Sequence, residues 1–139
     1  MKVITYTDGG SRGNPGPAAS GVYIQTDSGK ELARFGTFLG FQTNNFAEYT
    51  AIKEALFWID KHKKTLSHIE SIECRMDSQL ACRQLLGEYK VRHPHIKVLF
   101  DEIVRLQSKI GLPFRFVHVP REQNTLADAE VNRALDNMQ

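Results

Sequence analysis

The sequence predicts a single α/β domain, and three observations support this fold class. Strand-like segments occupy the first third of the chain, a segment with helical periodicity follows near residue 46, and further strand-like segments then alternate with helical ones. At 139 residues the chain is long enough to bury a substantial core without a disulfide or a metal ion. We therefore expect residues 1–139 to form one domain, without a linker or an internal repeat.

The first three strands are expected to form an antiparallel meander. The first begins at Val3 and ends at Asp8, and the glycines that follow supply a turn. Residues 18–26 alternate as in a half-buried strand, and a hairpin signal then leads to a third strand at 31–39. This part of the chain should therefore build one side of the sheet.

Helices and strands alternate in the rest of the chain. A long helix is expected at 46–62, because this segment has no glycine or proline and residues 43–45 offer N-caps. Within it, Glu48 shares one face with Ile52 and Ala55. The further elements expected are a strand at 69–76, a helix at 79–86 capped by Ser78, a helix at 96–110 ended by Gly111, a strand at 113–119 and a last helix capped by Asn124 or Thr125.

Composition excludes several classes of protein. Hydrophobic residues make up 41% and charged residues 24% of the chain, so neither disorder nor a fibrous repeat is indicated. No apolar run approaches the roughly 20 residues that span a bilayer, and the first two residues lead straight into a strand. We expect no membrane anchor, no signal peptide and a cytoplasmic location.

Cysteine spacing and net charge give little information about the function. Cys74 and Cys82 show no CxxC or Cys/His spacing, so we expect buried thiols rather than a zinc or redox site. The formal net charge of +2 is too small to indicate nucleic-acid binding by itself. Two local basic clusters are either solvated ends of elements or phosphate contacts: Lys61, Lys63 and Lys64, and Lys90, Arg92 and Lys97 with His93 and His95 between them.

Four acidic residues stand out by their places in the expected elements. Asp8 and Asp77 each close a strand at its carboxyl end, where ligand sites gather in sheets with helical crossovers. Glu48 and Asp128 each lie in the first turns of a helix, on its inward face. If the first and fourth strands are parallel neighbours, joined by a right-handed crossover, all four carboxylates converge on one pocket.

Such a cluster needs cations. Neighbouring, partly buried carboxylates repel one another and lose hydration, so divalent ions are required to keep them ionised together. A site built from oxygen ligands favours Mg²⁺ or Mn²⁺ over zinc. Two such ions, about 3.5–4 Å apart, are the usual device of phosphoryl chemistry, in which one activates water and the other stabilises the leaving oxygen.

Four motifs lie in one order along the chain: TDGGSRGNPGP at 7–17, TNNFAEY at 43–49, MDSQL at 76–80, and HVPREQN followed by AD at 118–128. With them the chain resembles type 1 ribonuclease H over nearly its whole length. The resemblance implies a ribonuclease H-like fold with a mixed five-stranded sheet in the order 3-2-1-4-5, whose first three strands are antiparallel. It also implies hydrolysis of the RNA strand of RNA/DNA hybrids to 5′-phosphate and 3′-hydroxyl products, with two Mg²⁺ or Mn²⁺ ions held at Asp8, Glu48, Asp77 and Asp128.

Substrate contacts follow from the same resemblance. Recognition of RNA needs hydrogen bonds to 2′-hydroxyl groups, and the amides of Asn44, Asn45 and Gln79 can both donate and accept them beside the acids. The alternative for the two asparagines is that they cap the helix, and one residue can do both. The remaining substrate contacts implied by the resemblance are Gly9, Ser11, Asn14 and Ser78.

Two residues are candidates for an auxiliary role. Many family members carry a histidine before the last acid, thought to shuttle protons or to help product leave, and His118 lies ten residues before Asp128. Strand alternation also allows His118 to be packed beside Phe116. Arg121 follows in the loop, and its permanent charge suits contact with the scissile phosphate, so we slightly favour it.

Three features depart from the family's pattern. Gly10 stands where the family commonly has the serine of DGS, so the turn can differ, and Glu130 replaces an apolar residue after the last acid. The short connection at 87–94 lacks the basic protruding helix of many bacterial members. Hybrid binding should then depend on the lysine clusters and be weak and salt-sensitive.

Two other functions are kept as alternatives. One is a non-catalytic module that binds hybrids or RNA, although a pure binder gains nothing from four carboxylates near a phosphate backbone. The other is a nuclease of the same fold that acts on double-stranded RNA or on DNA. For the leading interpretation, a ribonuclease H, we expect a monomer whose partner is an RNA/DNA hybrid and which binds no membrane.

Overall fold

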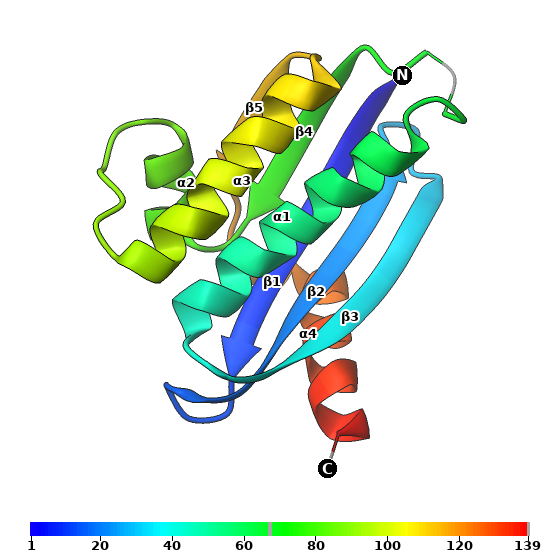
Figure 1. The fold of residues 1–139 in the computed structure, drawn as a ribbon. Helices are drawn as coiled ribbons and strands as arrows, with labels where there is room; N and C mark the ends of the chain where they lie inside the picture. The colour runs from blue at the N-terminus through cyan, green and yellow to red at the C-terminus, as the bar shows by residue number, and fades with distance from the viewer. Residues whose placement is uncertain (67, 139) are drawn as a thin grey trace.

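The computed structural model describes residues 1–66 and 68–138 and contains a five-stranded sheet with helices on both faces (Figure 1). The sheet order is β3-β2-β1-β4-β5; β2 pairs antiparallel with β1 and β3, and β4 pairs parallel with β1 and β5. The expected strand order and directions are therefore confirmed. The elements are β1 (Lys2–Ser11), β2 (Gly16–Thr26), β3 (Glu31–Gln42), α1 (Asn44–His62), β4 (Ser71–Met76), α2 (Gln79–Leu85), α3 (Pro94–Ile110), β5 (Phe114–His118), a 3₁₀ turn η1 (Arg121–Gln123) and α4 (Thr125–Asn137).

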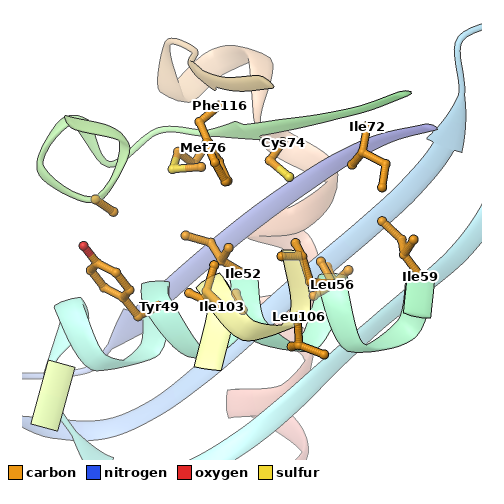
Figure 2. Packing of buried hydrophobic residues seen from close by; sticks show 14 of the residues in the cluster. Tyr49, Ile52, Leu56, Ile59, Ile72, Cys74, Met76, Ile103, Leu106 and Phe116 are labelled. Atoms are coloured by element: carbon orange, nitrogen blue, oxygen red, sulfur yellow. The ribbon is translucent and has the colours of Figure 1, made fainter. Parts of the chain in front are cut away.

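The main core lies on the sheet face that α1 and α3 cover. Figure 2 shows side chains of α1 and α3 meeting those of β4 and β5, among them Ile52, Ile103 and Met76. Each of these three is at most 2% exposed. The apolar residues at three- and four-residue spacing in α3 provide its buried stripe, so the helix is held by packing rather than by its own propensity.

The opposite face carries α4, which lies against β1, β2 and β3 (Figure 1). Gly21 and Gly36 are register partners on β2 and β3. A Cβ at Gly21 would lie 2.1 Å from the Ala127 carbonyl oxygen, and one at Gly36 would lie 2.3 Å from the Glu130 carbonyl oxygen. Because these positions lack side chains, the backbone of α4 rests directly on the sheet.

The first strand is longer than expected, and this is a correction. β1 continues through Asp8 to Ser11, with Gly9 paired to Ser20 and Gly10 paired to Ala19. These two glycines were read as turn residues, but β2 also begins earlier than expected, at Gly16, and supplies the pairing that extends the strand. The connection between β1 and β2 is therefore short.

Several helix ends match the sequence signals. Ser78 accepts a hydrogen bond from the Ala81 amide and so caps α2, and Gly111 ends α3 in the left-handed region with φ 69°. Among the candidates before α1, Thr43 is the residue that caps the helix, by accepting from the Phe46 amide. Within the described residues, no helix has both the length and the apolar composition needed to cross a bilayer.

Candidate active site

The register of β1 and β4 brings two acids to one edge of the sheet. The parallel pairing ends with Thr7 beside Met76, so Asp8 and Asp77 are the next residues on neighbouring strands. β4 stops there, while β1 continues for four more residues. Beyond the end of β4, side chains from both faces of the sheet can therefore reach the same space beside Asp8.

Asp8 faces the side of the sheet that carries α4. It pairs with Gly21, and residues paired across strands present their side chains to the same face. That face is the one where Gly21 meets the backbone of Ala127. Asp128 follows at once in the first turn of α4, and its carboxyl group lies close enough to that of Asp8 to raise the pKa of Asp8.

Gly9 points the opposite way and determines how close α1 lies. A Cβ at this position would be 2.2 Å from the Ala47 carbonyl carbon and 2.2 Å from the Glu48 amide nitrogen. The N-terminal part of α1 thus rests on the β1 backbone, with no side chain between them. This contact brings Glu48 to the edge from the face opposite Asp128.

The acids converge on one cavity of about 480 Å³. Carboxylate oxygens of Asp8, Glu48 and Asp77 lie within 4.8 Å of one another. Asp128 lines the same cavity, so the structure brings together all four acids that the sequence singled out. Every donor in this set is a carboxylate oxygen, which fits a hard divalent cation such as Mg²⁺ or Mn²⁺.

The protonation of two acids reflects this crowding. Burial first, then the charge of Asp77 and the neighbouring carboxyl group of Asp128, together raise the pKa of Asp8 to about 8, against a lowering by the Gly9 amide. Burial also raises the pKa of Glu48 to about 7, opposed by a hydrogen bond with Ser78. Without a cation, the cluster resists full ionisation, as expected for a site that a divalent ion completes.

Asn44 ties the loop after β1 to the start of α1. Its carboxamide oxygen accepts from the Ser11 amide at 2.7 Å and from the Ser11 hydroxyl at 3.1 Å. Its own backbone amide donates to the side-chain oxygen of Asn14 at 3.0 Å. Asn44 lines the acid cavity, and its oxygen is already used within the protein, so its amide N–H groups are the part left for a ligand.

The other expected substrate contacts are spread around the acids. Gly9 and Ser11 line the acid cavity, and Ser78 lies close enough to Glu48 to lower the pKa of that carboxyl group. Asn45 is partly buried in the first turn of α1 and is not among the residues that line this cavity. Gln79 is exposed and lines a separate groove between α2 and β5.

The two auxiliary candidates occupy different places. His118 is exposed, so the alternative of a packed histidine is wrong, and its Nε2 lies 3.2 Å from the backbone oxygen of Asp77. It lines the groove between α2 and β5 rather than the acid cavity. Arg121 is also exposed, and it lines the acid cavity directly.

Asn124 has a role that sequence reasoning missed. It was taken as a helix cap, yet its side chain makes no capping bond and is only 1% exposed. Its Nδ2 donates to the Thr7 carbonyl at 2.9 Å, and its backbone oxygen accepts from the Asp128 amide. One residue thus joins β1, just before Asp8, to the turn that carries Asp128. A polar residue just before the helix start was the available signal, and it fits either role.

Further polar contacts are made by residues of α4. The Asn132 side chain donates to the Asp128 carbonyl at 3.2 Å, and Arg12 pairs with Asp136 at 2.6 Å, which holds the loop after β1 against α4. Glu130, unexpected in the sequence, is buried and pairs with Arg133 at 2.9 Å.

Comparison with known sequences gives a consistent result. A family model described as reverse transcriptase-like matches residues 6–134. The chain is 39% identical over 137 residues to a bifunctional protein of Mycobacterium tuberculosis, a match covering 98% of this chain and 36% of the relative. It is 38% identical over 138 residues to ribonuclease HI of Halobacterium salinarum, covering 98% of this chain and 65% of the relative. The chain thus spans about a third of the mycobacterial protein and less than two-thirds of the halobacterial one.

Two solved structures match this chain over nearly their full length. The crystal structure of LC11-RNase H1 in complex with an RNA/DNA hybrid is 43% identical, has a TM-score of 0.91, and is matched over 98% of each chain. The crystal structure of RNase H1 from Halobacterium salinarum is 37% identical with a TM-score of 0.89, over 99% of each chain. The five-stranded sheet and its helices are therefore shared with these proteins.

Proposed function

This chain belongs to the ribonuclease H family, and we propose that it hydrolyses the RNA strand of RNA/DNA hybrids as a metal-dependent endonuclease. The observation that carries the proposal is the meeting of Asp8, Glu48 and Asp77, whose carboxylate oxygens lie within 4.8 Å of one another. Similarity to LC11-RNase H1, whose crystal structure is a complex with an RNA/DNA hybrid, supports the choice of substrate. Residues 1–139 would form the catalytic domain.

The four acids would hold the metal: Asp8, Glu48, Asp77 and Asp128. We propose two Mg²⁺ ions per site, with Mn²⁺ able to replace them, because all donors are oxygens and the site performs phosphoryl chemistry. Such ions, when bound, lower the pKa of water and stabilise the leaving oxygen of a phosphodiester. The protein's part is to hold the carboxylates in place from both faces of the sheet.

Other residues would orient the RNA strand. The amide N–H groups of Asn44 and the side chain of Gln79 are candidates for contact with 2′-hydroxyl groups on either side of the acids. Arg121 would contact the scissile phosphate through its guanidinium, and its place in the lining of the acid cavity supports this role. Water attacks the phosphorus and the 3′ oxygen leaves, which yields 5′-phosphate and 3′-hydroxyl ends without a covalent enzyme intermediate.

The first test compares substrates and metals. An end-labelled RNA/DNA hybrid is incubated with Mg²⁺, Mn²⁺ or EDTA, beside the same RNA in duplex RNA, a DNA duplex and a DNA junction. We expect cutting that requires metal and is confined to the RNA of the hybrid. Cutting of duplex RNA or DNA would instead favour a different nuclease on this scaffold.

The second test separates catalysis from binding. Asp8→Asn removes one charged ligand but keeps the shape of the side chain, so cleavage should be abolished while hybrid binding survives. A protein that folds and binds hybrid but never cuts, in wild-type form, would make the non-catalytic binding module the better description. The cytoplasmic location and the monomeric state stay predictions from the sequence.

A further inference from the structure

A second groove lies beside the acid cavity, between α2 and the edge strand β5. It has a volume of about 310 Å³. β5 is at the end of the sheet order, and α2 packs beside it, so the groove opens at the margin of the fold. The residues of the groove that matter for its chemistry are Gln79, Arg83, Leu86, Glu88, Arg115 and His118.

The groove carries more positive than negative charge. Arg83 and Arg115 line it, and Glu88 is the one acid among its lining residues. Among the described residues, no ion pair involves either arginine; Arg83 lies over the ring of Tyr89 at 5.4 Å instead. Two guanidinium groups without a carboxylate partner, beside a ring nitrogen of His118, suit the binding of phosphate oxygens.

The groove adjoins the acid cavity at Asp77, although the two share no lining residue. The Nε2 of His118 lies 3.2 Å from the backbone oxygen of Asp77, whose carboxylate is one of the clustered acids. Gln79 follows two residues after Asp77 and lines the groove. Neighbouring strands are about 4.8 Å apart, so the end of β5 lies one strand spacing beyond the end of β4. A strand whose scissile phosphate sits on the acids can therefore extend into this groove.

We propose that this groove binds the sugar-phosphate backbone of the RNA strand next to the cut, through Arg83 and Arg115. The inference rests on the proposed function, since it places the strand from the acid cavity outward. It differs from the sequence-based expectation that hybrid binding depends on the two basic clusters, one of which is the lysine cluster at residues 61–64. That cluster lies at the far end of α1: Lys61 is about 20 Å from Glu48 along the helix axis.

The test measures binding of a labelled RNA/DNA hybrid to the Asp8→Asn protein, which separates the groove from catalysis. Adding Arg83→Gln and Arg115→Gln together should weaken binding about 10- to 100-fold. It should also lower the slope of log Kd against log salt by about two. In the active enzyme, the same double change should raise KM and leave kcat within about threefold.

A matched control removes the same charge elsewhere. Lys61→Gln with Lys64→Gln also lowers the net charge by two, and both side chains are exposed. If the groove binds the strand, this control changes affinity and salt slope little. Equal losses from the two pairs would mean a general charge effect and would overturn the proposal. If the double arginine variant folds poorly, the single change Arg115→Gln can be tested instead. The Arg115 side chain is exposed on an edge strand, so its replacement should not disturb folding.

The strand in the groove can be identified with hybrids that carry one neutral methylphosphonate linkage. At one position next to the cut in the RNA strand, this linkage should weaken binding to the Asp8→Asn protein. The same linkage should not weaken binding further in the variant in which Arg83 and Arg115 are both replaced by glutamine. An effect confined to the DNA strand would overturn the assignment to RNA. If the wild-type protein cuts no substrate while hybrid binding still depends on Arg83 and Arg115, the proposed nuclease function is wrong, but the proposal that the groove binds the RNA strand is upheld.

Discussion

Replacement of Gly9 by alanine should disable the site while leaving the fold in place. The added Cβ would lie 2.2 Å from two backbone atoms of α1, whereas ordinary contact begins near 3.4 Å. The atoms met are main chain, so no side chain can turn away. α1 and β1 must then separate by about 1 Å at this point.

Glu48 moves with that backbone, because its own amide nitrogen is one of the atoms displaced. A shift of about 1 Å in a catalytic group can cost about 100-fold in rate. Overpacking of a tight contact costs about 1–3 kcal/mol of stability. We therefore expect kcat on a hybrid to fall about 100-fold, and stabilisation by added Mn²⁺ in a thermal melt to shrink.

Gly10→Ala is the matched control in the same strand. Its Cβ would lie 3.6 Å from Val131 Cγ1, an ordinary contact, and neither Gly9 nor Gly10 has a positive φ. This variant should keep activity within about twofold and stability within about 0.5 kcal/mol. The reasoning is refuted if Gly9→Ala retains wild-type activity and melting temperature, or if Gly10→Ala loses as much.

Three further predictions concern single residues. Asn124→Ala leaves the Thr7 carbonyl without its buried donor, so the free energy of unfolding measured with urea should fall by about 1–3 kcal/mol. Activity should also fall, because Asp128 would be displaced. An unchanged free energy of unfolding would contradict this prediction. Because the pKa of Asp8 is raised to about 8, the folded protein binds a proton that the unfolded chain has lost above pH 4. Stability without metal should therefore fall as pH rises from about 4 to 8, and Asp8→Asn should flatten that fall in melts with EDTA; a steeper fall would argue against burial of this acid. Arg121→Ala should lower kcat about tenfold or more, since it lines the acid cavity, whereas His118→Ala should mainly raise KM; the reverse pattern in steady-state kinetics would assign the auxiliary role to the histidine.

The helices were largely predictable because their signals are local. Ser78 and Gly111 act through their own backbone and side chain, and the caps expected from them are the ones observed. The acids could be ranked for a similar reason, since each lies at the end of a strand or the start of a helix. What the local pattern leaves open is the exact partner of each element.

The length of β1 depended on partners elsewhere in the chain. Gly9 and Gly10 favour a turn when read locally, yet they lie in a strand because β2 begins at Gly16 and pairs with them. The reason for a glycine at position 9 is the backbone of Ala47, which is distant in sequence. A close approach of this kind leaves no mark on the neighbouring residues.

The roles of the residues around the acids were also decided in three dimensions. Asn124 precedes a helix, as a cap would, but its side chain donates to the Thr7 carbonyl of β1. His118 and Arg121 are three residues apart, yet the structure places them in different cavities.

The sequence by itself determined which residues carry the chemistry and in which kinds of element they lie. Helix and strand propensity, helix capping and the positions of the acids within their elements all depend on residues that are near one another in the chain. Only the tertiary structure decided that they meet. β1 continues after its pairing with β4 ends at Thr7 and Met76, which leaves one edge of the sheet open. At this edge Glu48 of α1 and Asp128 of α4 lie beside Asp8 from opposite faces of the sheet. That convergence depends on register and on glycine contacts between distant segments, which act only once the sheet has formed.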